Sequence, residues 1–429
     1  MFRTLVNAWK IADLRKKIMY TLLLLVVFRF GSVIPVPGLA PEALSQLLAA
    51  NENTLFSFFN NISGGAFEQT TIFAMSISPY INSSIIMNLL TVAVPSLERL
   101  SKEGEEGKKK IAQYTRYLTI VLAFIQAAGL YAMLLGNYNA IENPGAMTFI
   151  TIVFTFCAGT AFLMWLGEKI TEKGIGNGIS ILIFVGIVAR LPVAVESIGQ
   201  YLMAGVSASK IIMVAAILVL ALLIIGFVVF INDGERRIPV QYAKRVQGRK
   251  MYGGQSTHIP LKVCLAGVIP IIFAMSILSF PQTIATMLGK SPTTGFWGGF
   301  MAIFQQDHWV YAVLYFLLII FFTYFYTSIQ FNPVEMANNM KANGGFVPGL
   351  RPGKPTSDYI SKVLNKVTLI GAFALGIIAI IPIVMGMFDT GLNISMGGTS
   401  ILIVVSVALE TVKQLEAQML MRHYKGFLE

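Results

Sequence analysis

The sequence predicts an all-α integral membrane protein with ten membrane-spanning helices in two inverted, pseudo-symmetric halves and one short re-entrant helix. Three observations lead to this fold class. Only 12% of the 429 residues are charged and the mean hydropathy is +0.70, whereas soluble domains are about 25% charged. Apolar runs approach the roughly 20 residues that a helix needs to cross a bilayer. Lys and Arg gather in every second polar loop, which indicates that those loops are cytoplasmic.

The first element, residues 1–17, is too charged for a signal peptide. Its apolar residues recur at helical spacing: Phe2, Leu5, Val6, Trp9 and Ala12. This pattern predicts an amphipathic helix on the cytoplasmic membrane surface. A frayed terminus is the alternative.

Ten apolar spans follow this helix. They cover residues 18–34, 74–93, 112–135, 147–166, 179–198, 211–231, 262–281, 310–329, 365–386 and 398–413. All but four of the 32 Lys and Arg residues then fall in cytoplasmic stretches, the exceptions being Arg29, Arg190, Lys210 and Lys290. We therefore expect both termini in the cytoplasm.

The spans divide into two halves at the connection 190–210. The expected domains are the N-terminal helix 1–17, the first half 18–198, the second half 211–413 and a cytoplasmic C-terminal tail 414–429. Because each half has an odd number of spans, halves that share a fold are inverted, and the functional pathway lies between them. Few polar residues lie inside the predicted spans, and Asn88 is the most central of them. The pathway is therefore lined mainly by apolar side chains, which suits a gate that excludes water and ions.

Residues 55–66 fit no simple span. They begin with apolar residues and are then interrupted by Asn60, Asn61, Gly64 and Gly65. Such a segment is tolerated at membrane depth only where it is buried in protein or lines a cavity. We interpret it as a short re-entrant helix, with an ordinary outer loop as the alternative.

The remaining patterns indicate no chemistry. The two cysteines lie in apolar segments, and the three histidines are far apart, so neither a disulfide framework nor a metal cluster is predicted. The glycines of "EKGIGNGIS" lack dinucleotide-loop spacing, and Pro355 follows Lys354 where a phosphate-binding loop needs Ser or Thr. The net charge of +11 leaves room for an acidic partner such as ribosomal RNA, anionic lipid or an acidic protein surface.

Four long blocks closely resemble the SecY family, whose members form the channel of the Sec protein translocon. The blocks cover residues 64–119, 167–192, 235–274 and 331–360, in the family's order. The resemblance extends over essentially the whole chain. At Asn88 this sequence departs from the family pattern, in which Gln is common.

The resemblance implies an hourglass-shaped pore closed by a ring of branched apolar side chains. The ring residues are Ile81, Ile85, Ile183, Ile187, Ile272 and Ile403. Two pairs are spaced i, i+4, so each pair lies on one face of its helix. Such a ring repels water and ions and still deforms around a passing peptide.

The resemblance also implies a plug, a lateral gate and a docking surface. The plug covers about residues 55–66 and includes Leu55, Phe58, Phe59, Ile62, Gly64 and Gly65, the two glycines serving as a flexible joint. The gate between the second and seventh spans includes Asn88 and Ser276. A hydrogen bond within the bundle is the alternative for Asn88. The docking loops 232–262 and 331–364 carry Arg351, Arg237, Lys244, Arg245, Arg249 and Lys250.

The function that the resemblance implies is passive transport, without cofactor or metal. The chain would be the central pore subunit through which unfolded secretory proteins cross, and membrane proteins enter, the bacterial inner membrane. Its implied partners are SecE-type and SecG-type membrane subunits, a SecA-type ATPase motor, the ribosome, signal peptides, unfolded polypeptides and anionic lipids. The alternative is a secondary transporter or lipid scramblase, which predicts a charged or discontinuous site near the membrane midplane.

Overall fold

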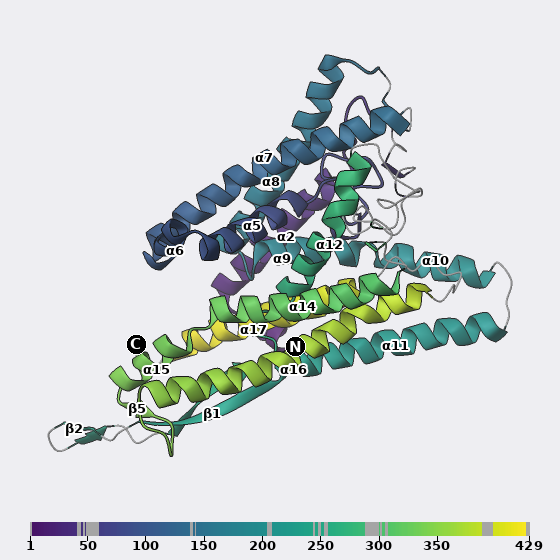
Figure 1. Ribbon diagram of the computed structural model, residues 1–429. Coiled ribbons are helices and arrows are strands. Elements are labelled where there is room, and N and C mark those ends of the chain that lie inside the picture. The colour runs from purple at the N-terminus through teal and green to yellow at the C-terminus, as the bar shows by residue number, and fades with distance from the viewer. Residues whose placement is uncertain are drawn as a thin grey trace.

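The computed structural model consists mainly of long helices that pack in two groups (Figure 1). It describes residues 2–425 except 41–43, 46–47, 49–59, 138–139, 142, 204–207, 243–244, 248–249, 253–255, 288–299, 301–302, 305–307 and 388–397. Helices α7 and α8 lie at one side of the molecule, and α11 and α16 lie at the other (Figure 1).

The first group of helices comes from the N-terminal part of the chain. Its members are α1 (Phe2–Lys10), α2 (Ala12–Gly31), α5 (Ser78–Ala93), α6 (Pro95–Lys102), α7 (Glu105–Asn137), α8 (Ala146–Lys173) and α9 (Gly178–Ala189). Within this group α7 packs between α5 and α8, while α2 and α9 both pack on α8.

The second group comes from the C-terminal part. Its members are α10 (Leu191–Met203), α11 (Ala208–Asp233), α12 (Ile269–Met287), α14 (Trp309–Gln330), α15 (Pro333–Ala342), α16 (Lys354–Met387) and α17 (Gly398–Lys425). Helix α14 packs between α12 and α16, and α17 packs on α11 and α16. Helix α17 also contacts α1 and α9, so it touches both groups.

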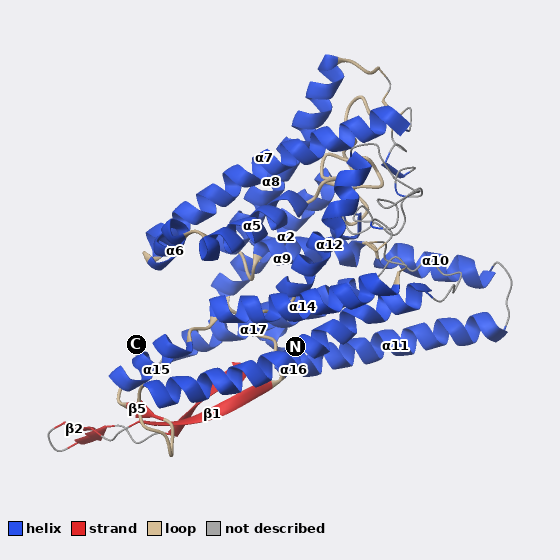
Figure 2. Ribbon diagram, viewed as in Figure 1, coloured by secondary structure: helices blue, strands red, loops and turns tan. Residues whose placement is uncertain are grey.

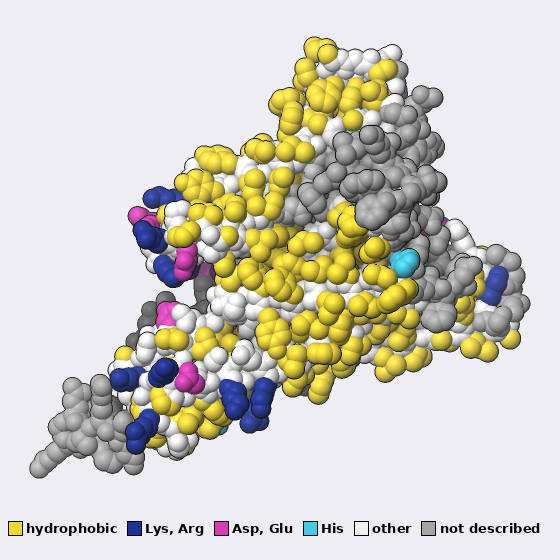
Figure 3. Space-filling model, in the orientation of Figure 1, with side chains coloured by type: hydrophobic (Ala, Val, Ile, Leu, Met, Phe, Trp, Pro, Cys, Tyr) yellow, Lys and Arg dark blue, Asp and Glu magenta, His cyan; other side chains and the backbone are white. Residues whose placement is uncertain are grey.

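The predicted membrane fold is confirmed by the length and apolarity of the helices. Among the described residues, six helical segments are long and apolar enough to cross a membrane, or seven if the bent pair α5 and α6 is one span. The other predicted spans fall on α2, α12 and α17. Apolar side chains cover the middle of the face seen in Figure 3, and most charged side chains lie at one end, near α6 and α15. The inverted symmetry of the two halves stays a prediction.

Two helices end where proline interrupts the sequence. Val94 is extended ahead of Pro95, as steric conflict with the proline ring requires, and the chain bends by 100° between α5 and α6. The predicted span 179–198 lies within the apolar segment Gly178–Met203, one of the six above, in which a single turn at Arg190 separates α9 from α10 next to Pro192. The sequence analysis treated this segment as one helix.

A small sheet, which the sequence analysis did not predict, joins the two loops that were predicted to be cytoplasmic (Figure 2). Strand β1 (Glu235–Tyr242) pairs antiparallel with β4 (Ser256–Lys262) along its length and with β5 (Gly345–Phe346) at its end. Strands β2 (Arg245–Gln247) and β3 (Lys250–Tyr252) form a separate hairpin. The apolar face of the sheet packs under α15 and α16 through Ile238, Val240, Leu261, Met340 and Ile360.

Candidate functional site

Five of the six predicted ring isoleucines belong to one apolar cluster. Ile183, Ile187 and Ile403 are buried in it, and Ile81 and Ile272 pack against it half-buried. They come from α5, α9, α12 and α17, so both groups of helices contribute. The cluster also contains Ile62, which follows the first described residues of the predicted plug.

The sixth isoleucine, Ile85, is buried in the adjoining cluster formed mainly by α11, α12, α14 and α16. Ile81 packs against both clusters. Because Ile81 and Ile85 lie one turn apart on α5, this helix connects the two clusters. Branched apolar side chains packed in this way exclude water, as an ion-tight constriction requires.

The predicted plug is described only from Asn60 onward; Leu55, Phe58 and Phe59 lie outside the described residues. Residues 60–63 form one helical turn, and Gly64 and Gly65 follow with φ of +70° and +88°. These backbone angles are strained for residues other than glycine. A Cβ on Gly186 of α9 would overlap the Ile62 carbonyl, so the plug backbone lies directly on α9.

Hydrogen bonds hold residues 60–71, which we call the plug base, in a single arrangement. Asn60 donates to Glu68 Oε2 (3.1 Å), and the Glu68 N–H donates to Asn60 Oδ1 (3.1 Å). The Ser63 hydroxyl donates to the Asn60 carbonyl and accepts from the Phe67 N–H. Asn60 and Ser63 are buried, so these bonds satisfy groups that are costly to leave unpaired.

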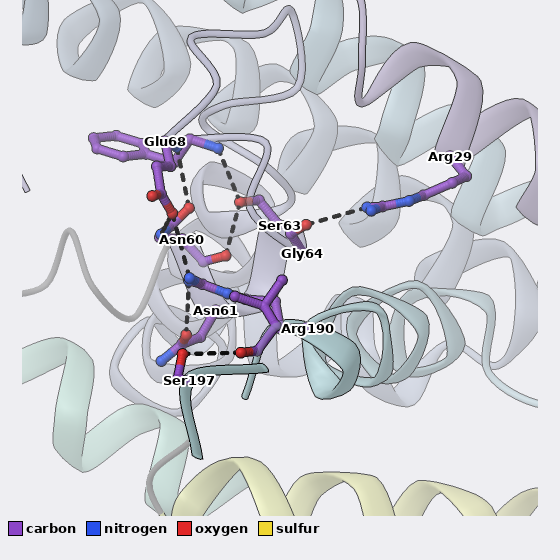
Figure 4. A network of polar contacts seen from close by, with 10 residues as sticks. Arg29, Asn60, Asn61, Ser63, Gly64, Glu68, Arg190 and Ser197 are labelled. Carbon is purple, nitrogen blue, oxygen red and sulfur yellow. Dashed lines mark hydrogen bonds and ion pairs between the residues drawn. The ribbon is translucent and has the colours of Figure 1, made fainter. Parts of the chain in front are cut away.

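Two arginines reach the plug base from neighbouring helices (Figure 4). Arg190, after the last residue of α9, donates to Asn61 Oδ1 (3.1 Å) and to Glu68 Oε2 (3.3 Å). Arg29, in the last turn of α2, donates to the Gly64 carbonyl (3.1 Å). The sequence analysis placed both arginines outside the predicted cytoplasmic stretches but assigned them no role.

The predicted gate residue Asn88 finds its partner on α14. Its amide donates to the hydroxyl of Tyr326 (2.8 Å), whose ring packs edge-on against Phe273 of α12 at 5.0 Å between centroids. Ser276, the other predicted gate residue, lies half-buried one turn further along α12. No signal in the sequence singled out Tyr326, because it is one aromatic residue among several in an apolar span.

The predicted docking residues lie on the sheet and the loop beside it. Arg237 is exposed on β1, Arg245 lies on β2 and Lys250 on β3, while Lys244 and Arg249 lie outside the described residues. Arg351 is exposed in a loop framed by Gly349 and Gly353, both with positive φ, and its carbonyl accepts from the Thr356 hydroxyl (2.8 Å). This bond fixes the loop backbone, so the Arg351 side chain starts from a defined position.

Within the described part of the chain, no group of three or more His, Cys, Asp or Glu residues is placed to hold a metal ion. Cys157 and Cys264 are both free thiols. The groups brought together at the centre of the molecule are apolar side chains, with one amide–phenol hydrogen bond at their edge.

Comparisons with known proteins agree with this arrangement. The family model described as SecY matches residues 71–412. The chain is 48% identical, over 100% of both chains, to the protein translocase subunit SecY of Halalkalibacterium halodurans. A second relative, the protein translocase subunit SecY of Streptomyces galbus, is 47% identical, again over 100% of both chains.

The fold is also similar to that of solved structures. A structure described as a protein conducting channel matches with a TM-score of 0.70 at 20% identity, covering 94% of this chain and 92% of that one. The channel of the canine ribosome-channel complex from the endoplasmic reticulum matches with a TM-score of 0.66 at 18% identity and the same coverage.

Proposed function

Because the chain belongs to the SecY family, we propose that it is the channel-forming subunit of a protein translocase. Through it, unfolded secretory proteins cross the membrane and membrane proteins enter the bilayer. The chain is a channel subunit and not an enzyme, so the energy for transport comes from a partner. Family membership favours this function over a secondary transporter or a lipid scramblase.

One observation carries the proposed pore. Ile62 of the plug base is buried in the same apolar cluster as Ile183, Ile187 and Ile403, which come from both groups of helices. A plug that seats on an apolar ring keeps ions out of an idle channel, because a hydrophobic constriction gates by excluding water. We therefore propose that the six isoleucines form the ring and that residues 55–66 form the plug.

The experiment that tests the ring replaces Ile85 and Ile187 together by Ser. We expect purified channels of this double variant in planar bilayers to conduct ions at rest, because two hydroxyls allow water to wet the constriction. The matched control replaces Ile86 and Ile225, which are more than a third exposed on α5 and α11, by Ser. Equal resting conductance of the two double variants would remove the ring assignment.

The lateral gate is proposed at the contact between α5 and the pair α12 and α14. Asn88 on α5 bonds Tyr326 on α14, and Tyr326 packs on Phe273 of α12, so three helices meet at one polar contact in an apolar seam. Separation of these helices would open a path from the ring toward lipid. Ser276 is proposed to lie at the same seam.

The partners are proposed from the basic end of the molecule. The sheet exposes Arg237, whose Nε pairs with Glu235 (2.6 Å), and the loop after β5 exposes Arg351. A guanidinium at such a place can bind a carboxylate or phosphate of a partner. We propose that a SecA-type ATPase and the ribosome dock there, and that SecE-type and SecG-type subunits complete the channel in the membrane. The channel of the canine complex binds a ribosome, which supports the ribosome as a partner.

The chain is a multi-pass membrane protein. We further propose that it resides in the bacterial inner membrane with both termini in the cytoplasm. The charge distribution supports this orientation, because Lys and Arg gather near α6 and α15 at one end of the molecule (Figure 3).

A further inference from the structure

We propose that Arg190 and Arg29 are positioning residues that clasp the plug base to the first and fifth spans and hold it in the idle channel. This inference deepens the proposed function, because it rests on residues 55–66 being the plug. The tests below separate a failure of the clasp from a failure of the plug assignment.

The first part of the clasp is a forked contact from α9. Nη1 of the Arg190 guanidinium donates to Asn61 Oδ1, and Nη2 donates to Glu68 Oε2. These two acceptors lie on opposite sides of the turn at Gly64 and Gly65, so one side chain ties both ends of the turn. The Arg190 side chain is 14% exposed and the Glu68 side chain 48% exposed, so solvent screens this ion pair in part, but less than a pair in which both side chains are exposed.

The second part comes from α2. Arg29 donates to the carbonyl of Gly64, the residue that directly follows the helical turn 60–63. Between the two arginines, the backbone of Ile62 and Gly64 lies against Gly186 with no room for a Cβ. The contacts of the two arginines (Figure 4) and the close approach to Gly186 together fix the position and the orientation of the plug base.

The distribution of Lys and Arg along the chain argues that the contacts of Arg29 and Arg190 with the plug base are not incidental. Only four of the 32 Lys and Arg residues lie outside the predicted cytoplasmic stretches, and two of them converge on this one segment. Basic residues on the outer side work against the charge asymmetry that orients a membrane protein. The presence of both Arg29 and Arg190 beside the plug base therefore indicates that positive charge has a role at this place.

The clasp also changes the interpretation of the plug glycines. Gly64 and Gly65 adopt positive φ inside a hydrogen-bonded turn, with the Gly65 N–H donating to the Asn60 carbonyl (3.0 Å). Glycine is needed there for the backbone angles and, at Gly64, for the close approach to Gly186. The plug base is therefore a fixed part of the structure and not a flexible joint. Moving it away from α9 requires the contacts of Arg190 and Arg29 to break.

The direct test measures how often the plug base leaves its seat. Ile62, which is buried, is replaced by Cys in a chain whose Cys157 and Cys264 are replaced by Ala. The channel is reconstituted in vesicles and labelled from outside with a membrane-impermeant maleimide. We expect Arg190→Gln and Glu68→Gln to label roughly tenfold faster than the parent, the scale of losing one charge-assisted hydrogen bond. Arg29→Gln should also label faster.

The matched control is Glu196→Gln. Glu196 is an exposed carboxylate on α10, at the same end of the molecule, and its neighbour is Gln200 one turn away. Labelling of this variant should equal that of the parent. Labelling that is unchanged in Arg190→Gln, Glu68→Gln and Arg29→Gln overturns the clasp.

An exchange of the two charges separates an ion-pair role from general destabilisation. Arg190→Glu alone should label faster, because it places two carboxylates together. Arg190→Glu combined with Glu68→Arg should return the labelling rate part of the way toward that of the parent, since the ion pair is restored with its ends reversed while the bonds from Asn60 to Glu68 and from Arg190 to Asn61 are lost. If the double variant labels as fast as the single one, the ion pair is not what holds the segment, and the proposal is wrong.

Resting conductance distinguishes the clasp from the plug assignment beneath it. Deleting residues 57–65 should raise the resting leak of the channel, and Arg190→Gln should raise it less. Faster labelling in Arg190→Gln without added leak in the deletion supports the clasp and refutes the plug assignment. Added leak in the deletion with unchanged labelling supports the plug and refutes the clasp.

Discussion

The hydrogen bond between Asn88 and Tyr326 is the polar contact that joins the two groups of helices at the proposed gate. Asn88 lies on α5 of the first group, and Tyr326 lies on α14 of the second. The phenol is buried and its ring is held between Phe273 and neighbouring apolar side chains. In an apolar seam such a bond has no water to replace it, so it favours the closed arrangement.

Replacing Tyr326 by Phe should weaken this seam without changing its shape. The ring and its contact with Phe273 remain, but the Asn88 amide loses its acceptor. We expect a cost of about 1 kcal/mol to the closed arrangement, in line with the net value of a single hydrogen bond. The measurement is translocation of clients that carry weakened signal peptides, which should improve in Tyr326→Phe.

Tyr324 offers a matched control on the same helix. Its hydroxyl donates to the Asn365 carbonyl (3.1 Å), a bond from α14 to α16 within the second group. Tyr324→Phe therefore removes a phenol–acceptor bond without touching the seam. Improvement of weak signal peptides by both variants would mean that general destabilisation, and not the Asn88 contact, is responsible.

At the scale of single residues, the sequence predicts which polar side chains matter better than it predicts the residues that they contact. Asn88 stood out because it is the most central polar residue, and the structure confirms that it takes part in a polar contact. Its partner lies 238 positions later and is one of many aromatic residues on an apolar helix, so no local pattern could identify Tyr326. Arg190 and Arg29 were visible as outer charges, but their targets depend on the turn at Gly64, which only tertiary packing defines.

At the scale of elements, the sheet β4–β1–β5 joins two loops that are far apart in sequence into one unit. Gln241 of β1 pairs with Phe346 of β5, and Ile238 and Val240 are buried under α15 and α16. The alternation of Ile238, Pro239 and Val240 has the period of a strand, but three residues are too few to establish it. The sequence analysis therefore described these segments only as projecting loops.

Replacing Arg351 by Glu should abolish docking of an ATPase motor while leaving the channel intact. Arg351 is exposed, and its loop is fixed through its backbone by Thr356, so the side chain can change without unfolding the loop. A reversed charge repels the acidic group that the guanidinium would bind. We expect motor-driven translocation into vesicles to fall by at least about tenfold, the scale of one lost charged contact, with unchanged yield of folded protein.

Lys354→Glu is the control for Arg351→Glu. Lys354 is exposed three residues later, at the first position of α16, and the change in formal charge is identical. A carboxylate at a helix N-terminus is electrostatically favourable, so the fold should tolerate it. Equal loss of translocation in the two variants would indicate a general effect of charge on this face, and normal secretion by Arg351→Glu would contradict the docking role.

At the scale of the whole molecule, α17 connects the two groups of helices. Its Ile403 lies in the apolar cluster with the α9 isoleucines, and its Lys413 pairs with Asp233 at the end of α11 (2.6 Å). Further along, Leu415 is buried with Ala8, Leu14 and Ile175. Helix α17 thus extends past the predicted span 398–413, and its last turns seat the N-terminal helix α1.

The predicted spans and the observed helices agree where the membrane dictates the sequence, and they differ elsewhere. Spans follow from hydropathy and charge, two quantities that the bilayer imposes directly on the sequence, so each predicted span overlaps a helix. The predicted span 262–281 begins too early, because its first residue ends β4 and α12 begins only at Ile269. Helices α7 and α17 extend beyond the predicted spans into polar sequence, where hydropathy gives no signal. The ends of these two helices were therefore not predicted. The break at Arg190 was missed because apolar residues continue through it, although Pro192 marks it.

The contact between α17 and the N-terminal helix gives the last prediction. Leu415 is 3% exposed among Ala8, Leu14 and Ile175, and truncating a buried Leu to Ala typically costs about 2–5 kcal/mol. We expect Leu415→Ala to release α1 from the bundle, so that a protease added on the side of the membrane where α1 lies cleaves near Lys10 faster than in the parent. Leu420→Ala is the control, because Leu420 lies on the same helix with 70% exposure. If both variants are cleaved at the parental rate, α17 does not hold α1, and the connecting role of this helix is confined to its membrane span.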